Sequence, residues 1–259
     1  MLHYWFLLPV GIAVSTTVMS AGVSGATLWV PVYLLWLGLD TQLAFWLGLF
    51  TMLFGFGSGV YRNWRDGSYD GALVRRALMA SVPVALAAGW CAALINERVL
   101  VGAFGTFLFI YAGLIAYRTL RPGADADRRR RRPPYLRLVI GGTLTGLISI
   151  GVGVLAMPAV LRHRSIRTPA TAIGSLVMII FFTSMAAVLG RLRPAFVAQL
   201  SRELPQLVRI LVWVLPGAVT GGQLGPRLAR LLPSERHALL YFSTVLIGVG
   251  ALTLARAFG

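Results

Sequence analysis

The sequence contains no lysine, although it carries a formal net charge of +16 over 259 residues. All 24 basic residues are therefore arginines. A Schiff base with retinal or pyridoxal requires a lysine amine, so a retinal pigment and a pyridoxal enzyme are both excluded. The single cysteine, Cys91, lies in an apolar run and excludes an intrachain disulfide.

Ionisable side chains are also missing from the middle of the apolar runs. The carboxylates outside the basic linker stand at run ends or in loops: Asp40, Asp66, Asp70, Glu97, Glu203 and Glu235. The histidines also stand at run ends, without a common ligand spacing: His3, His163 and His237. Proton-driven transport usually needs a carboxylate or histidine at depth, and intramembrane proteolysis needs a catalytic set. We therefore expect no proton relay, no metal site, no cofactor and no enzymatic activity.

Apolar residues dominate instead, at 57% hydrophobic and 12% charged, with a mean hydropathy of +0.77. Runs of about 20 apolar residues are typical of membrane-spanning helices. The sequence thus predicts an all-α polytopic membrane protein in a bacterial-type inner (plasma) membrane, with lipid as a partner and no nucleic acid. The apolar runs lie at 5–37, 42–61, 72–95, 98–118, 136–161, 168–190, 205–226 and 237–257.

Two of these runs, 5–37 and 136–161, are interrupted by a glycine-rich segment followed by a proline. The first break is Gly22–Ala26 with Pro31, and the second is Ser149–Gly153 with Pro158. A broken helix exposes polar backbone groups at a cost of about several kcal/mol each, unless protein or a wet cavity satisfies them. Matched breaks in a duplicated membrane protein point to a substrate site between the repeats.

The eight runs divide into two repeats of four, each opening with a Gly/Pro-broken helix. The first repeat spans 1–118, a basic cytoplasmic linker spans 119–135, and the second repeat spans 136–259. If 136–161 crosses the membrane once, the repeats are parallel; if it is re-entrant, they are inverted. We favour inverted repeats, because 5–37 is too long for one span and too short for two.

Small polar groups near the breaks predict a neutral cradle for an anion, built from hydroxyls and free backbone N–H groups. Small residues also recur at spacings of four, at Gly142/Gly146 and Gly217/Gly221/Gly225. This spacing favours close helix packing over ligand contact, and it permits a homodimer.

The two breaks resemble the glycine-rich motif that opens each repeat of the TauE/SafE family of sulfite exporters. The copies read Gly22-Val-Ser-Gly-Ala-Thr-Leu-Trp-Val-Pro31 and Ser149-Ile-Gly-Val-Gly-Val-Leu-Ala-Met-Pro158. The Ala172-Ile-Gly-Ser175 segment resembles the start of the family's next helix. Taken with the hydroxyls beside the breaks, this resemblance implies Pro31 and Pro158 as shaping residues. The implied substrate-binding residues are Ser20, Gly22, Ser24, Gly25, Thr27, Ser149, Gly151, Gly153, Gly174 and Ser175.

Together these features predict a secondary transporter that exports a small anion, such as sulfite or an organosulfonate, by alternating access about the two breaks. The alternative from another class is a non-transporting membrane scaffold or assembly protein, whose breaks serve only helix packing.

Overall fold

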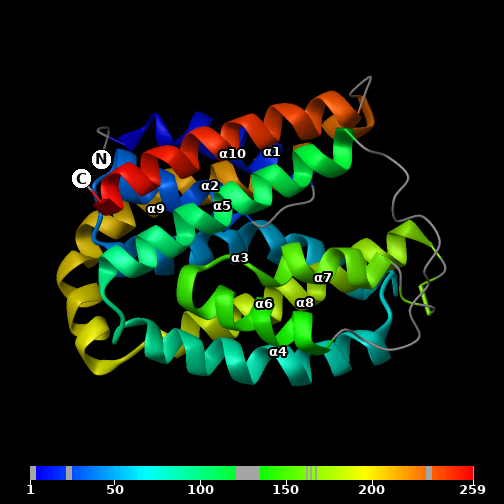
Figure 1. The fold of residues 1–259 in the computed structure, drawn as a ribbon, viewed down its shortest axis with the longest axis horizontal. Helices are drawn as coiled ribbons and strands as arrows, with labels where there is room; N and C mark the ends of the chain where they lie inside the picture. The colour runs from blue at the N-terminus through cyan, green and yellow to red at the C-terminus, as the bar shows by residue number, and fades with distance from the viewer. Residues whose placement is uncertain are drawn as a thin grey trace.

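The computed structural model describes residues 4–21, 25–120, 135–161, 163, 165–166, 168–231 and 235–258. These residues form ten α-helices and one π-helix (Figure 1). The first half contains α1 (Leu7–Ala21), α2 (Ala26–Pro31), the π-helix η2 (Val32–Trp36), α3 (Thr41–Arg65), α4 (Gly71–Ala92) and α5 (Glu97–Leu120). The second half contains α6 (Tyr135–Ile148), α7 (Val152–Leu161), α8 (Pro169–Gly190), α9 (Pro194–Leu231) and α10 (Glu235–Phe258).

Six of the described helices are long and apolar enough to cross a membrane: α3, α4, α5, α8, α9 and α10. The shorter apolar helices come in two groups, α1 with α2 and η2, and α6 with α7. This confirms the predicted polytopic helical class. The run predicted at 205–226 is wrong in extent, because α9 already begins at Pro194 and continues to Leu231. Residues 194–204 extend the helix ahead of this run and lie at one end of the bundle (Figure 1).

Each short group folds back on itself as a re-entrant hairpin. The ring of Phe6, just before α1, lies 5.3 Å from the ring of Trp36 at the end of η2. In the second group, a Cβ added to Gly141 of α6 would lie 2.8 Å from the Cα of Val152, the first residue of α7. The first hairpin therefore returns to the end where α1 begins, and α7 starts alongside α6.

Helix directions show that the second hairpin also returns to its own starting end. Gly142 and Gly146 of α6 face Ser81 and Ala85 of α4, so α6 and α4 run parallel. The contacts Ser81–Thr183 and Leu86–Gly190 make α4 parallel to α8. Since α6 and α8 then point the same way, α7 must carry the chain back before α8 begins.

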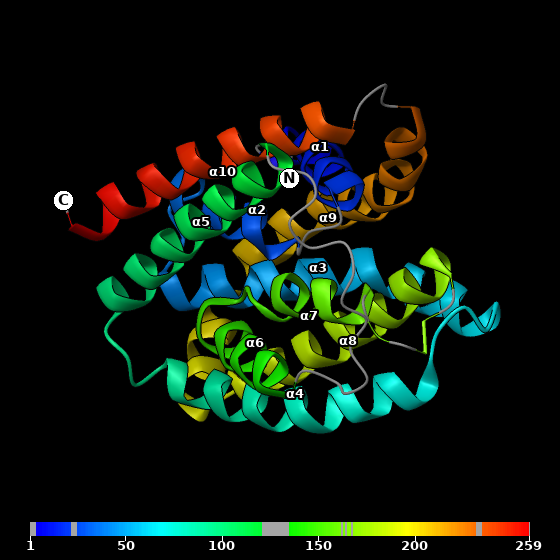
Figure 2. The same ribbon diagram turned by 45° about the vertical axis from the view of Figure 1, so that its right-hand side comes forward.

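Corresponding helices of the two halves run antiparallel to each other. The end of α3 meets the start of α8 at Asn63 and Gly174, and the start of α3 meets the end of α8 at Gln42 and Arg191. Helices α5 and α10 lie side by side in Figures 1 and 2 and pair in opposite directions, Gly102 with Phe258 and Gly105 with Leu254. Parallel repeats would place such counterparts in the same direction, so these contacts favour inverted repeats.

Each hairpin packs on the opposite half of the chain through glycine. A Cβ on Gly217 of α9 would lie 2.7 Å from the Leu8 carbonyl oxygen of α1, and one on Gly221 would lie 2.5 Å from that of Ile12. On the other side, a Cβ on Gly146 of α6 would lie 2.5 Å from the Ala85 carbonyl oxygen of α4. Glycine permits such close backbone approach. These glycines make helix contacts within the chain, so they do not by themselves argue for the homodimer.

The bundle has two ends, the Gln42 end and the Asp70 end. At the Gln42 end, α3 begins and α4 and α8 end. There Gln42 Nε2 donates to the Ala92 carbonyl oxygen of α4 at 3.1 Å. At the Asp70 end, α3 finishes and α4 begins. There the Asp70 backbone N–H donates to Ser175 Oγ of α8 at 2.9 Å, which joins the two halves.

The Asp70 carboxyl also connects the two halves. It accepts the Leu73 backbone N–H at 2.9 Å as the N-cap of α4. Burial alone raises the pKa of this carboxyl, but hydrogen bonds from Ser165 and from the α4 backbone, with nearby His163, hold it below its usual value. The ionised carboxylate therefore helps hold the α7–α8 connection at the Asp70 end.

Cysteine accessibility tests the inverted arrangement. In a Cys91→Ser background, we expect Asp66→Cys and Ser165→Cys to react with an impermeant thiol reagent from one side of the membrane. Ala93→Cys and Ala195→Cys should react only from the other side, because these exposed positions lie at the Gln42 end. Labelling of position 165 together with 93 would contradict the hairpin and support parallel repeats.

Candidate functional site

The second break turns the chain sharply between α6 and α7. Ser149 has a φ of 64° and Gly151 a φ of 149°, both in regions that L-residues rarely adopt. A Cβ on Gly151 would also lie 2.7 Å from the Leu144 Cβ, so glycine is required there. Ser149 Oγ donates to the Phe45 carbonyl oxygen of α3 at 2.9 Å, which fixes the turn against a membrane-spanning helix.

Thr145 satisfies part of the backbone that this break exposes. Its Oγ1 accepts the Val152 backbone N–H of α7 at 3.0 Å and donates to the Gly141 carbonyl oxygen of α6 at 2.7 Å. One hydroxyl therefore links the two arms of the hairpin. In lipid, each such unsatisfied group would cost about several kcal/mol.

The return helices α2 and α7, which form the second arm of each hairpin, begin at equivalent places. Gly25, the N-cap of α2, lies against α3, where an added Cβ would be 3.1 Å from Met52 Cγ. Gly153, in the first turn of α7, lies against α8, where an added Cβ would be 2.8 Å from Ile180 Cδ1. Met52 and Ile180 are both near the middle of their helices, so each break reaches the central part of the bundle.

A small cavity lies beside the first break, where α1, α2, α3 and α9 meet. Its volume is about 10 Å³, which is room for about one water molecule. No passage for an anion is open at this place. The cavity is lined by Ser15, Val18, Gly25, Trp29, Thr51, Met52, Gly55, Phe56 and Ala218.

Buried hydroxyls lie close to both hairpins. Thr51, in the cavity wall, shares a 2.7 Å hydrogen bond with Tyr33 of η2, and both side chains are fully buried. Thr27 is also fully buried, in the first turn of α2. In the other half, Ser81 of α4 and Thr183 of α8 share a 2.7 Å hydrogen bond. These hydroxyls place neutral hydrogen-bonding groups beside both hairpins without adding charge.

The two prolines lie in the return arms of the hairpins. Pro31 is the last residue of α2, and the π-helix η2 follows it. Because proline lacks an N–H, it cannot donate the next helical hydrogen bond. The wider turn then closes through the Leu37 N–H and the Val32 carbonyl oxygen at 3.0 Å. Pro158 lies within α7.

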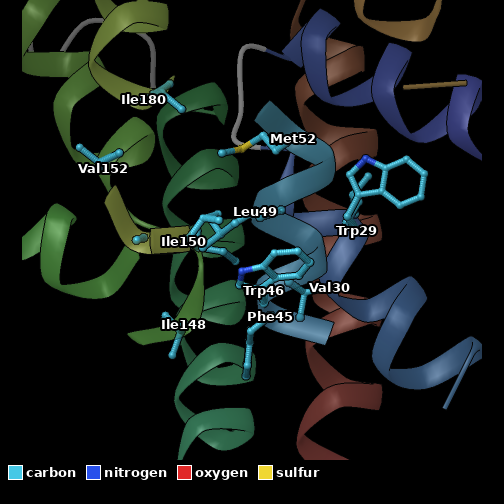
Figure 3. Close-up of a cluster of buried hydrophobic side chains, with 14 of the residues drawn as sticks. Trp29, Val30, Phe45, Trp46, Leu49, Met52, Ile148, Ile150, Val152 and Ile180 are labelled. Carbon is cyan, nitrogen blue, oxygen red and sulfur yellow. The ribbon is translucent and has the colours of Figure 1, made fainter. Parts of the chain in front are cut away.

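Apolar side chains fill the space between the hairpins. Figure 3 shows Ile150 of the second break between α3 and the α6–α7 hairpin, with Trp29 on the opposite side of α3. All the labelled side chains in this view are buried: Trp29, Val30, Phe45, Trp46, Leu49, Met52, Ile148, Ile150, Val152 and Ile180. This conformation is closed, and the apolar cluster separates the two breaks.

Some of the predicted binding residues lie away from the breaks. Ser175 Oγ accepts the Asp70 N–H and donates to the Thr171 carbonyl oxygen at 2.7 Å, and Gly174 packs against the Ser68 carbonyl oxygen. Both serve the contact at the Asp70 end. Gly22 and Ser24 are outside the described residues, and Ser20 lies in the last turn of α1.

Arg191 is a residue that the sequence analysis did not single out. It directly follows α8 and is only 3% exposed. Its guanidinium donates to the carbonyl oxygens of Gly146 and Leu147, at 2.8 and 2.6 Å, and to Gln42 Oε1 at 3.0 Å. The one available signal was its position directly after an apolar run. Nothing in the sequence indicates that the side chain folds inward.

Comparison with known proteins assigns the chain to a family. Neither the curated proteins nor the solved structures gave a match. A scan against protein families matched residues 7–253 to the family described as Sulfite exporter TauE/SafE. The match covers both hairpins and nearly all of the chain. This polytopic membrane protein therefore belongs to the TauE/SafE family of sulfite exporters.

Proposed function

We propose that the protein is a secondary transporter that exports a small anion, sulfite or an organosulfonate. The observation that carries the proposal is the pair of oppositely directed re-entrant hairpins, each with a return helix that begins beside the middle of a spanning helix. Broken helices that meet near the bilayer centre are typical of substrate sites in secondary transporters.

In this proposal the hairpins alternate access to a shared site. The anion is held by hydroxyls and backbone N–H groups, which need no buried carboxylate or lysine. Ile150 and its apolar neighbours close the path in the described conformation, and displacement of one hairpin opens it to one side. The proposed binding residues are Ser20, Gly22, Ser24, Gly25, Thr27, Ser149, Gly151 and Gly153. Gly174 and Ser175 lie at the Asp70 end and make the contact there, and their part in binding stays a prediction.

Arginine distribution orients the protein. The Asp70 end carries Arg62, Arg65, Arg75 and Arg76 around the α3–α4 connection. The linker that joins the end of α5 to the start of α6 contains five consecutive arginines. Because positive loops stay inside, we propose that this end faces the cytoplasm. An inside-negative potential then favours anion export by about 2.3 kcal/mol per charge per 100 mV.

Glycine substitutions at the breaks test the role of the hairpins. We expect Gly25→Leu and Gly153→Leu to abolish flux, because the new side chains would wedge α2 from Met52 and α7 from Ile180. Flexible side chains face both positions, so the variants should still fold. Flux is measured in proteoliposomes after size-exclusion chromatography has established a monodisperse preparation.

Gly113→Leu and Gly248→Leu are the matched controls. A Cβ at either glycine meets no atom within 4 Å, so the same substitution adds bulk on an open helix face. Both controls should transport at near the wild-type rate. Normal flux through the Gly25 and Gly153 variants would remove the breaks from the mechanism.

Counterflow identifies the substrate. Labelled sulfite is supplied outside proteoliposomes that hold unlabelled sulfite, taurine, sulfoacetate or acetate. We expect saturable uptake that the internal substrate accelerates, because a carrier returns faster when loaded. If folded protein shows no flux with any anion, the alternative hypothesis of a non-transporting membrane scaffold replaces this proposal.

A further inference from the structure

The most unusual charge in the described part of the chain is that of Arg191. Its side chain is 3% exposed, and no carboxylate forms an ion pair with it among the residues that the structure describes. Asp40, near in sequence to its partner Gln42, is engaged as the N-cap of α3, where it accepts the Gln42 N–H at 2.9 Å. A buried arginine without a counter-ion is costly, and in membrane proteins such residues are usually functional.

All the described polar partners of Arg191 are neutral oxygens. Two are the carbonyl oxygens of Gly146 and Leu147 near the end of α6, directly before the second break. The third is Gln42 Oε1, and the guanidinium carbon also lies 5.6 Å from the centre of the Phe45 ring. The guanidinium therefore covers the negative end of the α6 dipole while its own charge stays uncompensated.

Two buried donors lack an acceptor among the residues that the structure describes. They are Arg191 Nε and Trp46 Nε1. Trp46 follows Phe45, whose carbonyl oxygen binds Ser149 of the break, and in the view of Figure 3 its indole nitrogen is on the side of Ile150. Neither group can accept a hydrogen bond, so a ligand that satisfies them must bring acceptor oxygens.

We propose that the uncompensated charge of Arg191 makes the approach to the second break, from the Gln42 end, selective for anions. Capping alone does not require this charge, because a neutral amide can donate to carbonyl oxygens. The carbonyl end of α6 offsets only about half of a unit charge, so the guanidinium and the amide end of α7 together leave a positive potential beside the break. The role is that of a positioning and selectivity residue for the anion class, and it rests on the proposed transport function.

Gln42→Glu separates the charge of Arg191 from its hydrogen bonds. A glutamate at this position can still accept from Arg191, and it adds the missing negative charge. We expect roughly a tenfold or larger rise in KM for the transported anion, since a unit charge about 10 Å away has about this effect at an effective dielectric of 20. The thermal unfolding temperature should change little, because the ionic partner that the guanidinium gains offsets the lost hydrogen bond from Gln42 Nε2 to the Ala92 carbonyl oxygen.

Arg191→Lys and Arg191→Gln complete the comparison. Lysine keeps the charge but loses the two-armed donor geometry, so the KM should stay within about threefold while the unfolding temperature falls. Glutamine removes the charge, so the KM should rise and the unfolding temperature should fall. The matched control is Arg193→Gln, two residues away, where the guanidinium lies 5.1 Å from the centre of the Trp90 ring and is partly exposed. We expect a KM near the wild-type value for this variant.

The outcomes distinguish this inference from the proposed function. If wild-type protein transports an anion and Gln42→Glu retains the wild-type KM, the charge has no role in selectivity and Arg191 is only a helix cap. A rise in KM for Arg193→Gln equal to that for Arg191→Gln would also overturn the inference, because any surface charge would then suffice. Absence of flux in the wild-type protein overturns the proposed function itself.

Discussion

The structure depends on how an interrupted backbone is satisfied inside an apolar bundle. At the second break, Thr145 links the two arms, Ser149 binds the α3 backbone, and Arg191 covers the carbonyl oxygens at the end of α6. Each contact replaces a hydrogen bond that water supplies outside the membrane. Two of these three contacts come from α3 and from the end of α8, so the hairpin depends in part on these helices.

Close backbone packing makes this support possible. Gly217 and Gly221 bring α9 against α1, while Gly142 and Gly146 bring α6 against α4. Each hairpin is thereby attached to the half of the chain that does not contain it. Movement of a hairpin relative to its own half would then be coupled to the opposite half, and alternating access requires such a coupling.

Several features could be predicted from the sequence because they depend on local chemistry. Glycines weaken a helix through backbone freedom and a proline removes an N–H, so both breaks could be predicted, although α9 continues through a similar segment from Pro216 to Gly225. Helix lengths were recognised from apolar runs, except at α9, where residues 194–204, which include Gln199, Arg202 and Glu203, extend the helix ahead of the apolar run. The binding role of Ser175 stays a prediction, and its contact with the Asp70 backbone could not be predicted because the partner lies 105 residues away in the chain.

The sequence by itself determined that the chain is a helical membrane protein with two broken helices, since hydropathy and backbone freedom are properties of short segments. Only the tertiary structure decided that the breaks are re-entrant, that α3 and α8 run antiparallel, and that Arg191 turns inward to the end of α6. The physical reason is distance along the chain. Arg191 meets Gln42 and Gly146 across 149 and 45 residues, and no local pattern encodes contacts of that range.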